Sequence, residues 1–126
     1  MKTGYKVYDC MTTKPVSVSS DATLEQCAKA MAKNHVGALV VKDNHLSKGL
    51  ITEQDIVRKV LAKGINPLTK KVKDFMEIKL MTIGPNDDIY EALIKMRDYN
   101  IRHLPVVDNG KMVGLLTLKD VLKIEP

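Results

Sequence analysis

One stretch of the chain occurs twice, and this repeat constrains the fold more than any other feature. Residues 7–57 align without a gap with residues 72–122 at a shift of 65 positions, and thirteen of the fifty-one aligned positions are identical. A repeat of this length buries too little apolar surface to be stable alone, so we expect the copies to pack together about a pseudo-twofold axis. The identical pairs are Val7/Val72, Asp9/Asp74, Met11/Met76, Lys14/Lys79, Met31/Met96, Leu39/Leu104, Val41/Val106, Asp43/Asp108, Asn44/Asn109, Gly49/Gly114, Leu50/Leu115, Thr52/Thr117 and Asp55/Asp120.

The composition is that of a folded protein, with 126 residues of which 44% are hydrophobic and 28% charged. The apolar runs are too short to span a bilayer and the first residues are polar, so we expect a cytoplasmic protein with no membrane segment. Cys10 and Cys27 share no metal-ligand spacing and are interpreted as reduced core thiols, which gives no metal site.

Each copy is predicted to fold as strand, helix, strand, strand, helix, which makes the class α/β (α+β) with two β-α-β-β-α repeats. The domain boundaries are predicted as 5–62 for the first repeat, 63–71 for the linker and 72–124 for the second repeat. The predicted strands cover 15–19, 38–41 and 48–51 in the first repeat and 80–83, 103–107 and 112–116 in the second.

Capping signals place the helices at the same register in both copies. Thr23 can cap a helix while Gln26 reaches back, and Asp88 with Glu91 is expected to repeat this arrangement. An apolar stripe follows in each helix, and its methionines, Met31 and Met96, are expected in the core.

The predicted hairpins differ at their turns. Asn109-Gly110 is typical of a tight two-residue turn, because both residues tolerate positive φ. Asn44-His45 stands at the same place in the first copy without a glycine, and we expect a looser turn there. His35 and His45 are both expected at the surface.

The sequence Thr-x-x-Asp directly follows a Gly-Leu-aliphatic strand in both copies, as Gly49-Leu50-Ile51-Thr52 with Asp55 and as Gly114-Leu115-Leu116-Thr117 with Asp120. A structural interpretation is available, because Thr followed by an acidic residue three positions later approximates a capping box. The local residues favour that structural interpretation, and a functional interpretation stands beside it. A carboxylate can accept hydrogen bonds from two ribose hydroxyls, while the threonine and helix N–H groups hold an anion.

These motifs together resemble the CBS domains, whose tandem pair is called a Bateman module, and the resemblance covers about residues 5–124. The similar features include Val7-x-Asp9-x-Met11, the helix of residues 23–31, Gly37-Ala38-Leu39-Val40-Val41, both Thr-x-x-Asp segments and Arg102-His103-Leu104-Pro105-Val106-Val107-Asp108. In that family, paired domains bind AMP, ADP, ATP or S-adenosylmethionine in clefts between the copies. The resemblance therefore implies a regulatory, energy-sensing module that binds an adenosine-containing ligand.

The resemblance also implies which residues bind. Asp55 and Asp120 would hold ribose, Thr52 and Thr117 would hold ribose or phosphate, and the backbone of Lys14, Pro15 and Val16 and of Lys79, Leu80 and Met81 would flank adenine. Arg102 and His103, with Lys119, would supply positive charge for phosphate, and Pro105 completes the set. Gly37 and Ala38 stand opposite Arg102 and His103, so we expect one occupied site or two unequal ones.

Other functions are less well supported by the residues. The sequence has no nucleophile with a base and no Gly-rich phosphate loop, so we expect no enzyme and no resident cofactor, while magnesium beside a polyphosphate is left open. Nucleic-acid binding is one alternative, because lysines cluster near the linker at Lys63, Lys70, Lys71 and Lys73. A structural pairing module with degenerate sites is the other.

Regulation without an effector domain would have to act in trans, on an unidentified partner protein. We also expect a homodimer that forms through helix faces. Arg58 and Lys59 are interpreted as solvated helix-surface residues outside the site. The predicted dimer residues are Val57, Val60, Leu61, Val121 and Leu122.

Overall fold

The computed structural model describes residues 2–124, which form two compact units. One unit, called the central unit here, is the continuous stretch Val16–Lys79. The other, called the terminal unit, combines Met1–Pro15 with Leu80–Pro126. The spatial units therefore do not coincide with the sequence repeats, because the first residues of the chain pack with the second repeat.

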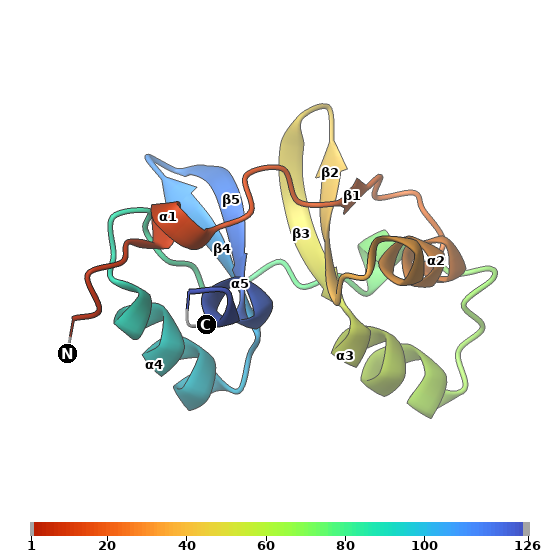
Figure 1. The fold of residues 1–126 in the computed structure, drawn as a ribbon. Coiled ribbons are helices and arrows are strands. Elements are labelled where there is room, and N and C mark those ends of the chain that lie inside the picture. Colours follow the sequence, from red (N-terminus) through yellow and green to blue (C-terminus); the bar gives the residue numbers. More distant parts are fainter. Residues whose placement is uncertain (1, 125–126) are drawn as a thin grey trace. The chain divides into compact units, whose positions relative to one another are not determined.

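The central unit contains a three-stranded sheet in the order β1-β2-β3 (Figure 1). Strand β1 (Ser17–Val18) runs parallel to β2 (Ala38–Asp43), and β2 pairs antiparallel with β3 (Leu46–Thr52). Helix α2 (Leu24–Asn34) connects the first two strands. After β3 the chain continues helically through α3 (Glu53–Asp55), the π-helix η1 (Ile56–Val60) and the 3-10 turn η2 (Leu61–Lys63), and a second 3-10 turn, η3, covers Val72–Asp74.

The terminal unit repeats this order with a smaller sheet, in which β4 (His103–Asp108) pairs antiparallel with β5 (Lys111–Thr117). Its helices are α1 (Val7–Cys10), α4 (Ile89–Tyr99) and α5 (Leu118–Leu122). The α+β class predicted from the repeat is confirmed, and the hairpins are longer than predicted by one to two residues at their ends.

The strand predicted over 80–83 is wrong, because only Ile83 pairs there, as an isolated bridge to Val106. The physical reason is a proline. In the central unit the Val40 N–H donates to the Val16 carbonyl at 3.0 Å. Pro105 is the counterpart of Val40 in the second repeat and has no N–H to donate, so the equivalent strand cannot extend.

The capping prediction holds in full for α2 and in part for α4. The Thr23 hydroxyl accepts the Gln26 N–H at 3.1 Å, and the Gln26 side chain accepts the Thr23 N–H at 2.9 Å. Asp88 instead caps α4 by accepting the Tyr90 N–H at 2.8 Å. Its carboxylate also accepts the N–H and the hydroxyl of Thr3, which fastens the start of the chain to the terminal unit.

Both hairpins close with two-residue turns of positive φ. Asn109 and Gly110 have φ of 51° and 77°, as predicted. Asn44 and His45 have φ of 49° and 66°, so the expected looser turn is wrong. The first hairpin adopts the left-handed conformation without glycine, at an energetic cost that non-glycine residues bear in such turns.

Each unit has its own apolar core, and each core contains a valine from the opposite sequence repeat. Val7 is fully buried in the terminal unit, and Val72 is fully buried in the central unit. Met31 and Met96 are both core residues, as predicted. Val60 and Val121 are also buried, which corrects their assignment to an exposed dimer face, because they point into these cores.

A short exchanged segment crosses the last strand of each hairpin. Thr12 pairs with Leu115 through two backbone hydrogen bonds of 2.9 Å, and Glu77 pairs with Leu50 through bonds of 2.8 and 3.0 Å. The shift of 65 relates these two pairings exactly in sequence. Gly114 and Gly49 lie directly under the crossings, where the backbone approaches too closely for a side chain.

Substitution of Gly114 by alanine should therefore destabilise the protein. The added Cβ would lie 2.7 Å from the Met11 sulfur and 2.9 Å from the Thr12 carbonyl oxygen. We expect a loss of about 1–3 kcal/mol in the free energy of unfolding, typical of overpacking. Urea denaturation of Gly114→Ala measures it, with the adjacent exposed Val113→Ala as control, and equal stability of both variants would contradict the close crossing.

The two cysteines should differ in reactivity. Burial raises the pKa of Cys27 to about 11, and that side chain is fully buried. Burial, followed by the charges of Asp9 and Asp120, also raises the pKa of Cys10, but this residue is only half-buried. Because the thiolate is the reactive form, native protein at pH 8 should be alkylated first at Cys10. Mass spectrometry of peptides after brief iodoacetamide treatment would show this order, and faster labelling of Cys27 would contradict it.

Candidate functional site

The repeated Thr-x-x-Asp segments both form reciprocal capping boxes. Thr52 accepts the Asp55 N–H at 3.2 Å, and Asp55 Oδ2 accepts the Thr52 N–H at 3.0 Å. Thr117 and Asp120 make the same two bonds at 3.1 and 3.0 Å. The helix-capping role considered for this motif is therefore present in both copies. It uses one carboxylate oxygen for the backbone and leaves Oδ1 for other partners.

At Asp55 the other oxygen contacts a lysine. Lys59 Nζ lies 3.1 Å from Asp55 Oδ1 and also pairs with Glu77 Oε1, so the ammonium bridges two carboxylates. Burial alone would lower the pKa of Lys59, but hydrogen bonds and charges of Glu77 and Asp55 outweigh it and raise that pKa. Lys59 is half-buried, so its interpretation as a solvated surface residue is wrong, whereas Arg58 is exposed as expected.

At Asp120 the corresponding contact comes from a neutral hydroxyl. Thr12 Oγ1 donates toward Asp120 from 3.3 Å to Oδ1 and 3.2 Å to Oδ2. Lys123 Nζ lies farther away, at 3.7 Å, and its side chain is 70% exposed. Both aspartates are nearly buried, with exposures of 7% for Asp55 and 5% for Asp120.

The terminal unit brings four predicted site residues to one end of its hairpin. His103 is paired with Thr117 in the register of β4 and β5. The Arg102 carbonyl accepts the N–H of Leu118, at the start of the helix that carries Asp120, at 3.0 Å. Arg102 is exposed and His103 is half-buried. Arg102 and His103 therefore lie at the beginning of β4, beside the Thr-x-x-Asp cap.

The central unit makes the same backbone arrangement without the polar side chains. Ala38 is paired with Thr52, and the Gly37 carbonyl accepts the Glu53 N–H at 2.9 Å. The equivalent end of this unit thus presents Gly37 and Ala38 in place of Arg102 and His103. The backbone is therefore matched at the ends of the two hairpins, and the two copies differ there in their side chains.

The remaining predicted residues lie at more varied places. The stretches 14–16 and 79–81 are where the chain passes from one unit to the other. Lys14, Lys79 and Lys119 are exposed, while Pro15, Val16, Leu80 and Met81 are half-buried. Pro105 is buried within β4, where its carbonyl accepts the Ile83 N–H, so it contributes to the fold rather than offering a free polar group.

Three contacts to the aspartates were not found by sequence reasoning, namely those from Thr12, Lys59 and Lys123, nor was the pairing of Glu77 with Lys59. The spacing of Asp55 and Lys59 by four residues was a visible signal, because such residues are neighbours on a helix. Thr12 and Glu77 are equivalent under the shift of 65, but they differ in chemistry. Nothing local in the sequence indicates that they reach the opposite repeat.

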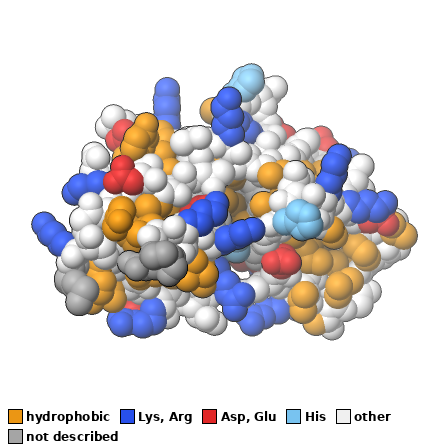
Figure 2. Space-filling model, viewed as in Figure 1, with side chains coloured by type: hydrophobic (Ala, Val, Ile, Leu, Met, Phe, Trp, Pro, Cys, Tyr) orange, Lys and Arg blue, Asp and Glu red, His pale blue; other side chains and the backbone are white. Residues whose placement is uncertain are grey.

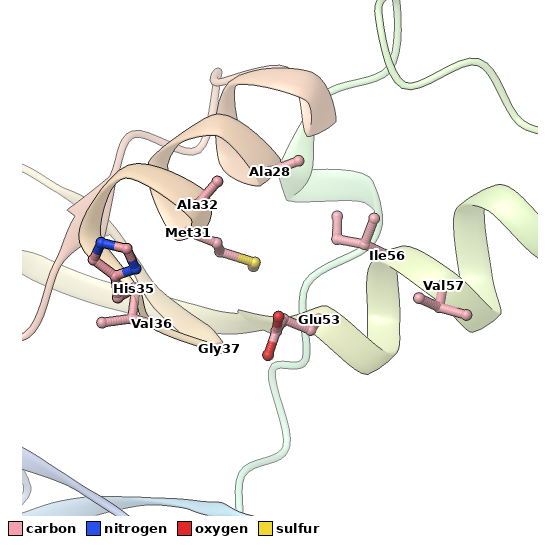
Figure 3. A pocket seen from close by; sticks show the side chains of 9 residues that line it. All are labelled: Ala28, Met31, Ala32, His35, Val36, Gly37, Glu53, Ile56 and Val57. Carbon is pink, nitrogen blue, oxygen red and sulfur yellow. The ribbon is translucent and has the colours of Figure 1, made fainter. Parts of the chain in front are cut away.

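An apolar groove lies between α2 and the helix that begins with α3 in the central unit (Figure 3). Met31 points toward Ile56 across it, and Glu53 stands near Gly37 at one end. Of the predicted site residues only Gly37 lines this groove, so it is distinct from the aspartate caps. The full lining is Ala28, Met31, Ala32, His35, Val36, Gly37, Glu53, Ile56 and Val57.

The lysines near the predicted linker are partly neutralised. Asp21 lies 3.2 Å from Lys73 Nζ and 3.6 Å from Lys71 Nζ. The hydrogen bond from Lys73, then the charges of both lysines, lower the pKa of Asp21. Figure 2 shows basic side chains interspersed with acidic and apolar ones on the face it presents, rather than gathered in one patch.

Within residues 2–124, no helix has the length and apolarity to cross a bilayer. The same residues contain no group of three or more His, Cys, Asp or Glu side chains placed to hold a metal ion. His35 and His45 are exposed, as predicted.

Comparisons with known proteins bear on the whole chain. An uncharacterized protein of Methanocaldococcus jannaschii is 40% identical over 116 residues, which cover 90% of this chain and 62% of that protein. The match to a relative from Methanopyrus kandleri covers 58% of the length of that protein. The chain thus spans about 60% of the length of these two archaeal relatives.

Solved structures with the same fold include an uncharacterized conserved protein of Pyrococcus horikoshii, with a TM-score of 0.90 and 30% identity. That match covers 98% of this chain and 94% of the other. The CBS domain pair of protein MJ0100, in complex with 5′-methylthioadenosine and S-adenosyl-L-methionine, has a TM-score of 0.81 and 29% identity. It covers 95% of this chain and 94% of that chain.

The family model of the CBS domain matches twice, at residues 7–62 and 72–126. These two matches follow the sequence repeat and together take in most of the chain. The chain therefore belongs to the CBS-domain family, as a tandem CBS pair.

Proposed function

We propose that this CBS pair is a regulatory module, not an enzyme, that binds an adenosine-containing ligand at the Thr117–Asp120 cap of the terminal unit. The ligand would be an adenine nucleotide or S-adenosylmethionine, and the bound state would be passed to a partner protein in trans. Support for the ligand class comes from the related CBS pair that was solved with 5′-methylthioadenosine and S-adenosyl-L-methionine.

The observation that carries this proposal is the environment of Asp120. Its carboxylate accepts the Thr117 backbone N–H and the neutral Thr12 hydroxyl, while the 70% exposed Lys123 lies farther away, at 3.7 Å. Ribose hydroxyls are donors of the same kind, so they can replace the threonine hydroxyl without leaving a charge unpaired. Thr117 would contribute a second polar contact from the same cap.

Arg102 supports binding of a phosphorylated ligand. Arg102 is exposed, and its carbonyl accepts the N–H of Leu118, the first residue of α5. Arg102 therefore lies at the same end of the unit as the start of the helix that carries Asp120. A guanidinium can bind phosphate oxygens through two parallel hydrogen bonds. His103 and Lys119 are further polar residues at this end of the unit.

A thermal-shift panel with AMP, ADP, ATP, S-adenosylmethionine and NAD tests the ligand class. Ligand at about 100 times its dissociation constant should add about 2.7 kcal/mol to stability. We expect a shift with at least one adenosine-containing compound and none with inorganic phosphate. The absence of any shift would contradict the proposal and favour a structural pairing module. RNA binding that falls steeply with salt would favour the nucleic-acid alternative.

Asp120→Ala should abolish the ligand-induced shift, because it removes the ribose acceptor. The substitution also removes a helix cap, so the quantity to compare is the shift on adding ligand rather than the melting temperature alone. Asp88→Ala is the matched control, since Asp88 is a buried capping carboxylate of the same unit. Loss of the shift in both variants, or in neither, would contradict a ribose role for Asp120.

Self-association is the second part of the proposal. Val57 and Leu61 are each 56% exposed on consecutive turns of the helix that lines the apolar groove. Exposed apolar surface of this kind is typical of an interface, and a second copy of the chain is the partner expected for it.

Val57→Glu should therefore shift the protein toward monomer in sedimentation equilibrium, because a buried interface would have to desolvate the new charge. Leu46→Glu is the control, since Leu46 is 61% exposed on the hairpin of the same unit, away from this helix. A wild-type protein that is monomeric at high concentration would contradict self-association.

A further inference from the structure

The first repeat carries a lysine that competes with ligand for its own aspartate. We propose that Lys59, held by Glu77, keeps the Asp55 site closed, so that the chain binds adenosine-containing ligands at Asp120 alone. This inference rests on the proposed function and identifies the residues that make the two repeats unequal.

Both oxygens of Asp55 are occupied by strong donors. Oδ2 accepts the Thr52 N–H, and Oδ1 lies 3.1 Å from the Lys59 ammonium. The Asp55 side chain is only 9% exposed whereas that of Lys59 is 38% exposed, so the carboxylate is the buried member of this pair. Charge-assisted hydrogen bonds are about twice as strong as neutral ones, and leaving a buried carboxylate without its cation is costly.

Glu77 fixes the lysine in this position. It belongs to the segment that crosses β3, where both of its backbone hydrogen bonds go to Leu50. Its carboxylate pairs with Lys59, so a ligand that displaced the ammonium from Asp55 would have to move a side chain anchored at a second point. The lysine also lies in the π-helix that begins directly after Asp55.

In the second repeat the ammonium beside the aspartate is more distant and more exposed, since Lys123 Nζ lies 3.7 Å from Asp120 Oδ1 and its side chain is 70% exposed. The positions of Lys59 and Glu77 are also changed. The shift of 65 puts Ile124 in place of Lys59 and Thr12 in place of Glu77. Ile124 packs against the core of the terminal unit, and Thr12 offers a neutral hydroxyl to Asp120. A ribose hydroxyl would replace a hydroxyl at Asp120, whereas at Asp55 it would have to replace a paired ammonium.

The variant Lys59→Ile/Glu77→Thr gives the first site the residues of the second, and calorimetric titration with adenosine counts the open sites. Adenosine carries no phosphate, so the count does not depend on the difference between Arg102 and Gly37. We expect one site per chain in the wild type and two in the variant. Adding Asp55→Ala to the variant should return the count to one.

The single variant Glu77→Gln keeps the lysine but frees it from its second carboxylate. We expect a second site there too, weaker than in the double variant, and this gives a test should the double variant fail to fold. Circular dichroism would report folding of each protein before titration.

The outcomes separate this inference from the proposed function. One site in the wild type and in both variants overturns the role of Lys59 but leaves ligand binding at Asp120 intact. Two sites in the wild type also overturn it. No site in the wild type but one in the double variant supports closure by Lys59 and contradicts the function proposed for Asp120. No site in any of these proteins contradicts both.

Discussion

The crossing of the exchanged segments over Gly49 and Gly114 is the contact on which each unit depends. At Gly114 a Cβ would meet the Met11 sulfur at 2.7 Å, and at Gly49 it would meet the Glu77 carbonyl oxygen at 2.6 Å. Only glycine lets the segment lie this close to the strand and complete its pair of backbone bonds. Because Val7 and Val72 are carried into the cores by these segments, neither repeat can complete its core from its own sequence. The two halves of the chain are therefore expected to fold together rather than one after the other.

The same crossings bring the residues that distinguish the two aspartates. Thr12 and Glu77 follow the crossing methionines directly. Thr12 donates to Asp120 of the terminal unit, and Glu77 pairs with Lys59, the partner of Asp55, in the central unit. Thr-x-x-Asp does structural work in both copies, since it closes a capping box at the start of α3 and of α5. Under the proposed function, binding capacity depends on what holds the free carboxylate oxygen. The motif meets the same fold requirement in both copies, so the motif alone does not reveal whether a given copy binds.

The features predicted from the sequence are those that depend on near neighbours in the chain. The capping of α2 by Thr23, the turn at Asn109-Gly110 and the burial of Met31 and Met96 all follow from spacings of a few residues. The strand expected at 80–83 failed because it depends on a donor that Pro105 lacks, and this partner lies more than twenty residues away. The prediction of a looser turn at Asn44-His45 was wrong for a different reason. Tertiary pairing of β2 with β3 holds both residues at positive φ, although neither is glycine. The exchange of Met11 and Met76 between repeats could not be predicted, because an internal repeat gives the same alignment whether or not its ends are exchanged.

The duplication gives two matching hairpins, each followed by a capped helix, and the side chains around them decide whether the two copies are equal in function. Arg102 against Gly37 changes only the charge offered to a ligand at the strand end. Lys59 against Ile124 changes more, because it gives Asp55 an internal cation at 3.1 Å that Glu77 also holds, whereas Lys123 lies 3.7 Å from Asp120 and is 70% exposed. An internal partner is favoured over a free ligand of similar chemistry, since it pays no entropy of association. A copy with such a partner keeps its capping box and its contribution to stability while losing its access to ligand. If Lys59 closes its site as proposed, the Asp55 copy supports the fold while the Asp120 copy responds to ligand, and one ion pair anchored by Glu77 produces that division.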